Sequence, residues 1–80
     1  MKKIIAFSCK ASNAGVVNTV NNFCTNCNFE ASASEVEDIT AGTVIRVESL
    51  YETQCIELVT FILTNFDVGY MFYGDKPLVG

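Results

Sequence analysis

Residues 49–66 read SLYETQCIELVTFILTNF, and this segment decides the fold. Ser49 and Glu52 have the spacing of a capping box, in which a serine hydroxyl and a glutamate carboxylate each satisfy a backbone amide at a helix start. Behind them, apolar side chains recur at i, i+3, i+4 and i+7, the pattern of a helix with one face on the core. They are Cys55, Leu58, Val59, Ile62, Leu63 and Phe66. The segment predicts a helix from about Leu50 to Asn65.

A first strand and a first helix are predicted ahead of this segment. Residues 3–9 place apolar or small side chains on both faces, which is typical of a central strand. Residues 12–15 read SNAG, and a Ser or Asn side chain there can accept amide protons of a first helical turn. Helical spacing is then shown by Val16, Val17, Val20 and Phe23. The pairs Asn21-Asn22 and Thr25-Asn26 predict the helix end, because Asn competes for local hydrogen bonds.

Three further strands are indicated by side chains that alternate between apolar and polar types. Residues 28–34 alternate in this way, and Val36 falls out of phase, so we expect a bulge near Ser34 or Glu35. Residues 38–42 predict a turn, and residues 43–48 a second strand that forms a hairpin with the first. Residues 68–73 predict a last strand. Residues 74–80 predict a turn and a loose tail, because Pro77 cannot donate to a strand ladder.

The order strand, helix, strand, strand, helix, strand is that of the split β-α-β, or ferredoxin-like, fold. We therefore predict an α+β fold of βαββαβ order, with a four-stranded antiparallel sheet and two helices on one face. The 80 residues predict a single domain, since so short a chain cannot divide its core between two units. The apolar runs are too short for a signal peptide or a membrane span, so a cytoplasmic location is expected.

Composition disfavours several classes of function. The formal net charge is −4, so direct binding of nucleic acid would lack the cations that phosphates need. The chain has no histidine, which removes the commonest general base and the usual partner of a Ser or Cys nucleophile. It also has no glycine-rich phosphate loop. We therefore expect a protein that is not an enzyme and needs no cofactor.

Four cysteines leave a redox or metal hypothesis open. Cys24 and Cys27 are two residues apart, as in redox disulfides and in half of a zinc site. A zinc site would need Cys9 and Cys55 as well, yet both stand at positions where small core residues are common. A redox site usually places its thiols at a helix start, whereas these lie at the predicted helix end. Reduced thiols are the favoured interpretation, and no metal site is predicted.

Acidic residues gather on or beside the predicted hairpin and form the candidate partner-binding site. They are Glu30, Glu35, Glu37, Asp38 and Glu48. A solvated strand face would explain them, and so would a docking surface for a Lys- or Arg-rich protein groove, including a groove that otherwise holds nucleic acid. Tyr51, Tyr70 and Tyr73 have side chains that are partly apolar and partly polar. Each could contact a partner, or it could be a core or half-buried residue.

A family resemblance covers residues 4–29, in which a strand leads through SNAGVV to a helix that ends in Cys27-Asn28-Phe29. This stretch resembles an ACT domain, where a strand is followed by a loop with a Pro-Gly pair, a helix and a short turn into an Asn-Ile-like strand. Ala14-Gly15 stands in place of Pro-Gly, and the Asp-Arg-Pro that usually precedes this glycine is not present. The resemblance implies a regulatory domain that binds an amino acid at a dimer interface, near Asn13 and Gly15.

Three functional hypotheses follow. The first is a small protein-interaction module that modulates or inhibits a larger macromolecule through its acidic hairpin. Small inhibitors that phages or plasmids carry against host defence systems are similar in size and charge. The second is an ACT-like sensor of a small ligand such as an amino acid. The third is a thiol-redox or zinc protein that uses Cys24 and Cys27. A homodimer is an open expectation, because the strand edges of an exposed sheet favour pairing.

Overall fold

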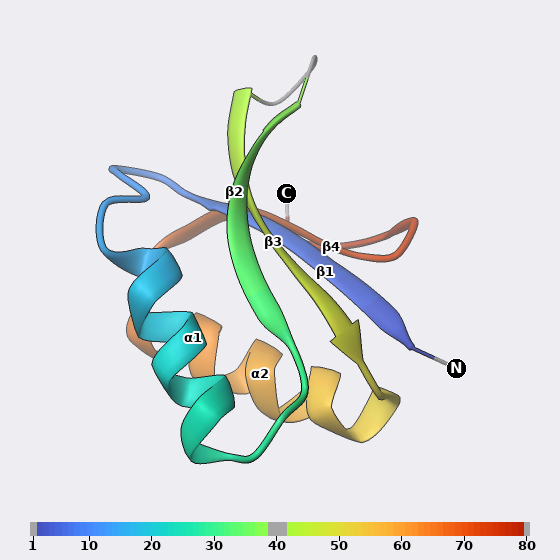
Figure 1. Ribbon diagram of the computed structural model, residues 1–80. Helices are drawn as coiled ribbons and strands as arrows, with labels where there is room; N and C mark the ends of the chain where they lie inside the picture. Colours follow the sequence, from blue (N-terminus) through green and yellow to red (C-terminus); the bar gives the residue numbers. More distant parts are fainter. Residues whose placement is uncertain (1, 39–41, 80) are drawn as a thin grey trace.

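The computed structural model describes residues 2–38 and 42–79, which form two helices and a single sheet. The elements in chain order are β1 (Lys3–Cys9), α1 (Val16–Asn26), β2 (Ser32–Asp38), β3 (Gly42–Leu50), α2 (Glu52–Asn65), β4 (Val68–Tyr73) and β5 (Lys76–Val79). The strand order across the sheet is β2-β3-β1-β4-β5, and every neighbouring pair is antiparallel. Figure 1 shows both helices on the same side of the sheet. The predicted α+β architecture is confirmed, but the sheet has five strands and not four.

The fifth strand comes from the segment predicted to be a loose tail. Gly74, at φ 61°, turns the chain after β4, and its amide donates to the Ile4 carbonyl at 2.8 Å. The returning chain then pairs with β4, with Pro77 opposite Phe72. Proline is tolerated in a strand that lies at a sheet edge, because the missing N–H costs no ladder bond there. The tail prediction was wrong because Pro77 excludes a central strand but not an edge strand.

The core lies between the helices and the facing side of the sheet. Ile5 and Phe7 on β1 and Leu58 on α2 are fully buried within it. The two helices meet through aromatic rings, since the centroids of the stacked Phe23 and Phe61 rings are 4.1 Å apart. The other core members are Val16, Val20, Cys24, Ala33, Ile45, Val47, Leu50, Cys55, Ile62, Val68 and Met71. These residues place the predicted apolar stripes of both helices against one sheet face.

The start of α2 lies two residues beyond its predicted position. Ser49 and Leu50 belong to β3, and the helix begins at Glu52 with Tyr51 as its N-cap. The reciprocal bond of the cap is made by Gln54, whose Oε1 accepts the Tyr51 backbone N–H at 3.0 Å. The predicted Ser49–Glu52 capping box is therefore wrong. Its sequence spacing was right for a cap, but Leu50 is buried in the sheet and holds this segment in β3.

The start of α1 also differs from its prediction. The N-cap is Gly15 and no side chain caps the helix. The Ser12 hydroxyl accepts the Ala14 N–H at 3.0 Å, within the loop, and the Asn13 side chain turns to the strands. The expected side-chain cap is therefore wrong, because both candidate side chains have other backbone partners.

Asn21 protects a sheet edge and does not end α1, which continues to Asn26 as the Thr25-Asn26 pair predicted. Its Nδ2 donates to the Ala33 carbonyl at 3.2 Å, and its Oδ1 accepts the Ala33 N–H at 2.8 Å. Ala33 is on β2, the outermost strand on this side. These two bonds occupy backbone groups that would otherwise offer a template for another strand. The Asn21-Asn22 helix-end prediction was wrong because Asn21 bonds across to β2.

The substitution Asn21→Ala is expected to lower the free energy of unfolding by about 1–3 kcal/mol, because it leaves the Ala33 N–H and carbonyl without their side-chain partners. Urea denaturation followed by circular dichroism measures the loss. The matched control is Asn22→Ala one position along, where the exposed side chain makes no bond within the described residues. Equal losses in the two variants would show that helix propensity, and not the edge bonds, sets the stability here.

The predicted bulge in β2 is not found. The pairing of β2 with β3 runs without a register shift from Ser32 opposite Glu48 to Asp38 opposite Gly42. Val36 lies opposite Val44, on the sheet face away from the helices. This face is apolar here as well, so Val36 needs no bulge to explain its position. The hairpin itself is confirmed, while the predicted turn at residues 38–42 falls largely on residues 39–41, outside the described residues.

Candidate protein-binding surfaces

The hairpin of β2 and β3 carries the first candidate surface. Figure 1 shows this hairpin projecting from the rest of the sheet. Glu35 and Glu37 lie on the same face of β2, and both side chains are exposed. Glu37 is oriented by Thr43 of β3, whose hydroxyl donates to Glu37 Oε1 at 2.8 Å. Glu30 is also exposed and precedes β2.

The predicted acidic residues do not all share one face. Glu48 alternates with the buried Val47, so it points to the opposite face of the sheet from Glu35 and Glu37. Its Oε1 lies 3.4 Å from Arg46 Nε, which balances its charge. Asp38 is the last residue of β2. The structure therefore brings Glu35 and Glu37 together and separates Glu48 from them.

Asn13 and Gly15, the residues implied by the ACT resemblance, lie in the connection from β1 to α1. Asn13 Oδ1 accepts the Cys9 N–H at 3.0 Å, and its Nδ2 donates to the Thr43 carbonyl at 3.1 Å. Asn13 thus ties this connection to both β1 and β3. Gly15 is the N-cap of α1 at φ 75°, a left-handed conformation that favours glycine. Both residues have structural roles that require no ligand.

The four thiols lie in separate surroundings. Cys24 is buried in the core, where burial and, to a lesser extent, the neighbouring Cys27 raise its pKa. Cys27 is the half-buried C-cap of α1. Burial is also the largest cause of the raised pKa of Cys9 and of Cys55. Within residues 2–38 and 42–79, no three Cys, Asp or Glu side chains gather in a way that would hold a metal ion.

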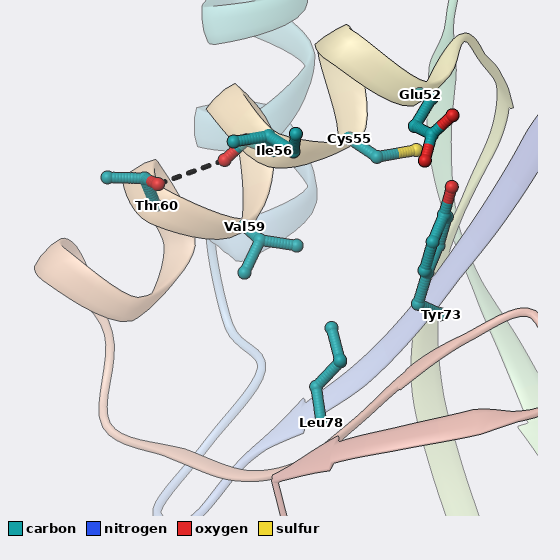
Figure 2. A pocket seen from close by; sticks show the side chains of 7 residues that line it. All are labelled: Glu52, Cys55, Ile56, Val59, Thr60, Tyr73 and Leu78. Carbon is teal, nitrogen blue, oxygen red and sulfur yellow. Dashed lines mark hydrogen bonds between the residues drawn. The ribbon is translucent and has the colours of Figure 1, made fainter.

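A groove between α2 and the β4–β5 hairpin is the second candidate surface (Figure 2). Its volume is about 240 Å³. Val59 and Leu78 point toward each other across it, while the Tyr73 hydroxyl points toward Cys55 and Glu52 at one end. Burial raises the pKa of the Cys55 thiol, and the Tyr73 hydroxyl acts against this larger effect to lower it. The remaining lining residues are Ile56 and Thr60.

Two exposed hydrophobic side chains, Ile56 and Leu78, line this groove. Among the described residues, the large exposed hydrophobic side chains are Tyr51, Ile56, Leu63 and Leu78, at 50%, 65%, 45% and 41% exposure. The first precedes α2, the next two lie on α2, and Leu78 lies on β5. From the sequence, Leu63 was predicted to face the core and Leu78 to belong to a loose tail. The signal it missed is a second apolar row on α2, in which Val59 packs partly against the core while Ile56 and Leu63 are exposed.

Comparisons with known proteins identify no relative: no protein-family model matches the chain, and no match was found among curated proteins or solved structures. No helix in the described part of the chain is long and apolar enough to cross a membrane.

Proposed function

We propose that this chain is a small non-enzymatic protein-interaction module that modulates or inhibits a larger macromolecule through its acidic hairpin. The observation that carries the proposal is the pair Glu35 and Glu37, exposed together on an edge strand that projects from the sheet (Figure 1). The formal net charge of −4 adds a long-range field of the same sign. Such a field steers a positively charged partner toward the hairpin and raises its association rate.

The partner expected from this chemistry is a protein with a Lys- or Arg-rich surface. Two carboxylates on one strand face stand about 7 Å apart, a spacing that neighbouring basic side chains in a groove can match. A partner groove that otherwise holds nucleic acid has this character. The proposal therefore includes inhibition of a host defence protein by a phage- or plasmid-borne inhibitor, which acts by occupying such a groove.

The test is affinity capture from the source organism, followed by binding measurements on the purified partner at low and high salt. Glu35→Lys is expected to weaken binding at least about tenfold, because it places a like charge against a basic surface. Glu57→Lys is the control, since it makes the same change of charge at an exposed position on α2, away from the hairpin. Equal weakening by both variants would assign the effect to net charge and remove the hairpin as the contact.

Two alternative functions have sharper tests but less support. An ACT-like sensor would bind a small ligand such as an amino acid near Asn13 and Gly15, and a ligand that binds only the folded chain must raise its melting temperature. No rise with any amino acid at millimolar concentration would remove this alternative. A thiol-redox or zinc protein would use Cys24 and Cys27, and titration of four free thiols in metal-free protein would remove that one.

A homodimer formed through the sheet edges is hindered at one position of β2 and along β5. Asn21 occupies the backbone of β2 at Ala33, and β5 is short and contains Pro77. Both features hinder the addition of a strand. Sedimentation of the purified chain across a range of concentrations would measure its oligomeric state.

A further inference from the structure

The sheet face opposite the helices is apolar, although no helix of the described residues covers it. Both helices lie on the other side of the sheet (Figure 1). On the open face, Ile4, Ala6, Val36, Tyr70 and Phe72 are half-buried, and none of them belongs to the core cluster or packs against it. The solvated face of an antiparallel sheet normally carries polar side chains. An apolar open face therefore indicates a contact surface.

The register of the strands places a small residue between two large ones on this face. Ala6 of the central strand β1 pairs with Arg46 of β3 on one side and with Phe72 of β4 on the other. Cross-strand partners share a face, so Arg46 and Phe72 stand on it about 10 Å apart, at two strand spacings. Ser8 is the next residue of β1 on the same face and is also small. A hollow of about 370 Å³ results, and its lining includes Ala6, Arg46 and Tyr70.

The charges around the hollow favour a second copy of this chain as its occupant. Among the described residues that line it, Arg46 is the only cation, and Glu37 and Asp75 are the anions. Glu48 stands beside Arg46, with its Oε1 3.4 Å from the Arg46 Nε. These carboxylates disfavour a nucleic acid strand, and Arg46 disfavours a uniformly basic protein surface. A second copy brings both signs of charge and the same apolar residues, so the face can be complementary to itself.

A two-fold axis that runs along β1, between two stacked sheets, satisfies this complementarity. The rotation carries β3 of one copy over β4 of the other, because the two strands flank β1 on opposite sides. Arg46 of each copy then lies against the Phe72 ring of the other copy, which is a favourable contact of a cation with an aromatic face. The two Ala6 residues meet at the axis. Stacked sheets stand about 10 Å apart, a gap that long side chains fill and small ones leave open.

The area of the face is sufficient for a weak but specific dimer. One strand residue covers about 16 Å² of a sheet face, from a rise of about 3.3 Å and a strand spacing of about 4.8 Å. The five strands therefore present about 500 Å² per copy, and two copies would bury about 1,000 Å², near the lower limit for a specific interface. We expect monomer and dimer to exchange at micromolar concentrations.

We propose that the open sheet face binds a second copy of this chain about a two-fold axis along β1, with Arg46 of each copy against Phe72 of the other. The inference does not depend on a partner at the acidic hairpin. Glu35 alternates with Val36 and so points away from the paired faces. The dimer therefore leaves Glu35 exposed in both copies.

The first experiment measures self-association of the full chain. Sedimentation from about 1 µM to 1 mM is expected to show a dimer with a dissociation constant of about 1–100 µM, as an interface of this size implies. In ¹⁵N spectra, dilution should shift the amide signals of residues 4–8, 44–46 and 70–72 and leave those of residues 56–64 on α2 unchanged. A chain that stays monomeric at about 1 mM would overturn the proposal, and so would shifts confined to α2.

A double-mutant cycle tests the contact between Arg46 and Phe72. Arg46→Ala and Phe72→Ala are each expected to raise the dissociation constant at least about tenfold. The double variant should raise it by less than the product of the two effects, because each single change already removes the same contact. Circular dichroism checks that each variant is folded. Fully independent effects would mean that the two side chains do not meet across the axis, which would remove this pairing.

A charge reversal tests the face without changing a half-buried ring. Arg46 has a side chain that is 44% exposed, so Arg46→Glu should fold and should raise the dissociation constant at least about tenfold. Lys76→Glu is the matched control, since it makes the same change of charge at an exposed position opposite Tyr73, which lies on the helix side of the sheet. It should leave the dissociation constant within about twofold. Equal weakening by both variants would assign the effect to net charge and rule out the open face as the interface.

Discussion

Replacing Leu58 by alanine is expected to lower the free energy of unfolding by about 3 kcal/mol, within the range of about 2–5 kcal/mol for buried leucines. Leu58 is fully buried in the middle of α2 and packs into the core shared by both helices and the sheet. Truncation removes its apolar contacts and leaves a cavity that the surroundings fill only in part. Small domains have a total stability of about 5–15 kcal/mol, so the melting temperature should fall by more than about 10 °C.

Leu63→Ala is the matched control for this prediction, because it makes the same chemical change five residues along the same helix. Leu63 is 45% exposed, so truncation should cost less than about 1 kcal/mol. Urea denaturation followed by circular dichroism measures both variants. A loss for Leu63→Ala as large as that for Leu58→Ala would mean that Leu63 is buried and that its exposure has been assigned incorrectly.

The sequence predicted the elements whose side chains repeat with a clear period. The row through Leu58 and Ile62 predicted α2, and the alternation in residues 43–48 and 68–73 predicted β3 and β4. The features that failed depend on neighbours distant in sequence. Asn21 is a residue type that is typical of helix ends, but in the structure its side chain bonds to the backbone of Ala33. Val36 is out of phase with the core-facing residues, but it pairs with Val44 on the far face of the sheet, which is apolar there too. The spacing of neighbouring residues in the sequence does not show which distant residues will pack or pair with them.

The candidate sites were predictable in part for the same reason. Period two places Glu35 and Glu37 on one strand face with Ala33, a phase that the predicted bulge near Ser34 or Glu35 would have broken. Their exposure follows only from the structure, in which the hairpin projects from the rest of the sheet (Figure 1). The separation of Glu48 follows only from the register, which puts Ser32 opposite it and leaves Val47 to face the core. The groove required both the excess apolar row of α2 and the existence of β5. The apolar row of α2 can be seen in the sequence as Ile56, Val59 and Leu63. Strand β5 was not predicted, because Pro77 was taken as evidence against a strand.

Raising the pH above about 8.5 is expected to destabilise the chain through its buried thiols. Burial raises the pKa of Cys24, with a smaller contribution from Cys27. Burial also raises the pKa of Cys55, although the Tyr73 hydroxyl acts in the opposite direction. The pKa of Cys9 is raised by burial and then by the Asp67 carboxylate. Folded thiols with a raised pKa keep their protons where unfolded thiols have lost them. Stability is therefore fully present below the unfolded thiol pKa and falls as the pH rises toward the folded pKa values.

Between its unfolded and its folded pKa, each such thiol contributes a slope of at most about 1.4 kcal/mol per pH unit. Urea denaturation at several values between about pH 7.5 and 9.5 measures it. Cys24→Ala provides the control. The variant should be less stable at neutral pH, because it loses a buried sulfur, but its stability should fall less steeply, so the two curves converge as the pH rises. Parallel curves would show that Cys24 ionises as readily in the folded chain as in the unfolded one, and that its burial in the core has been assigned incorrectly.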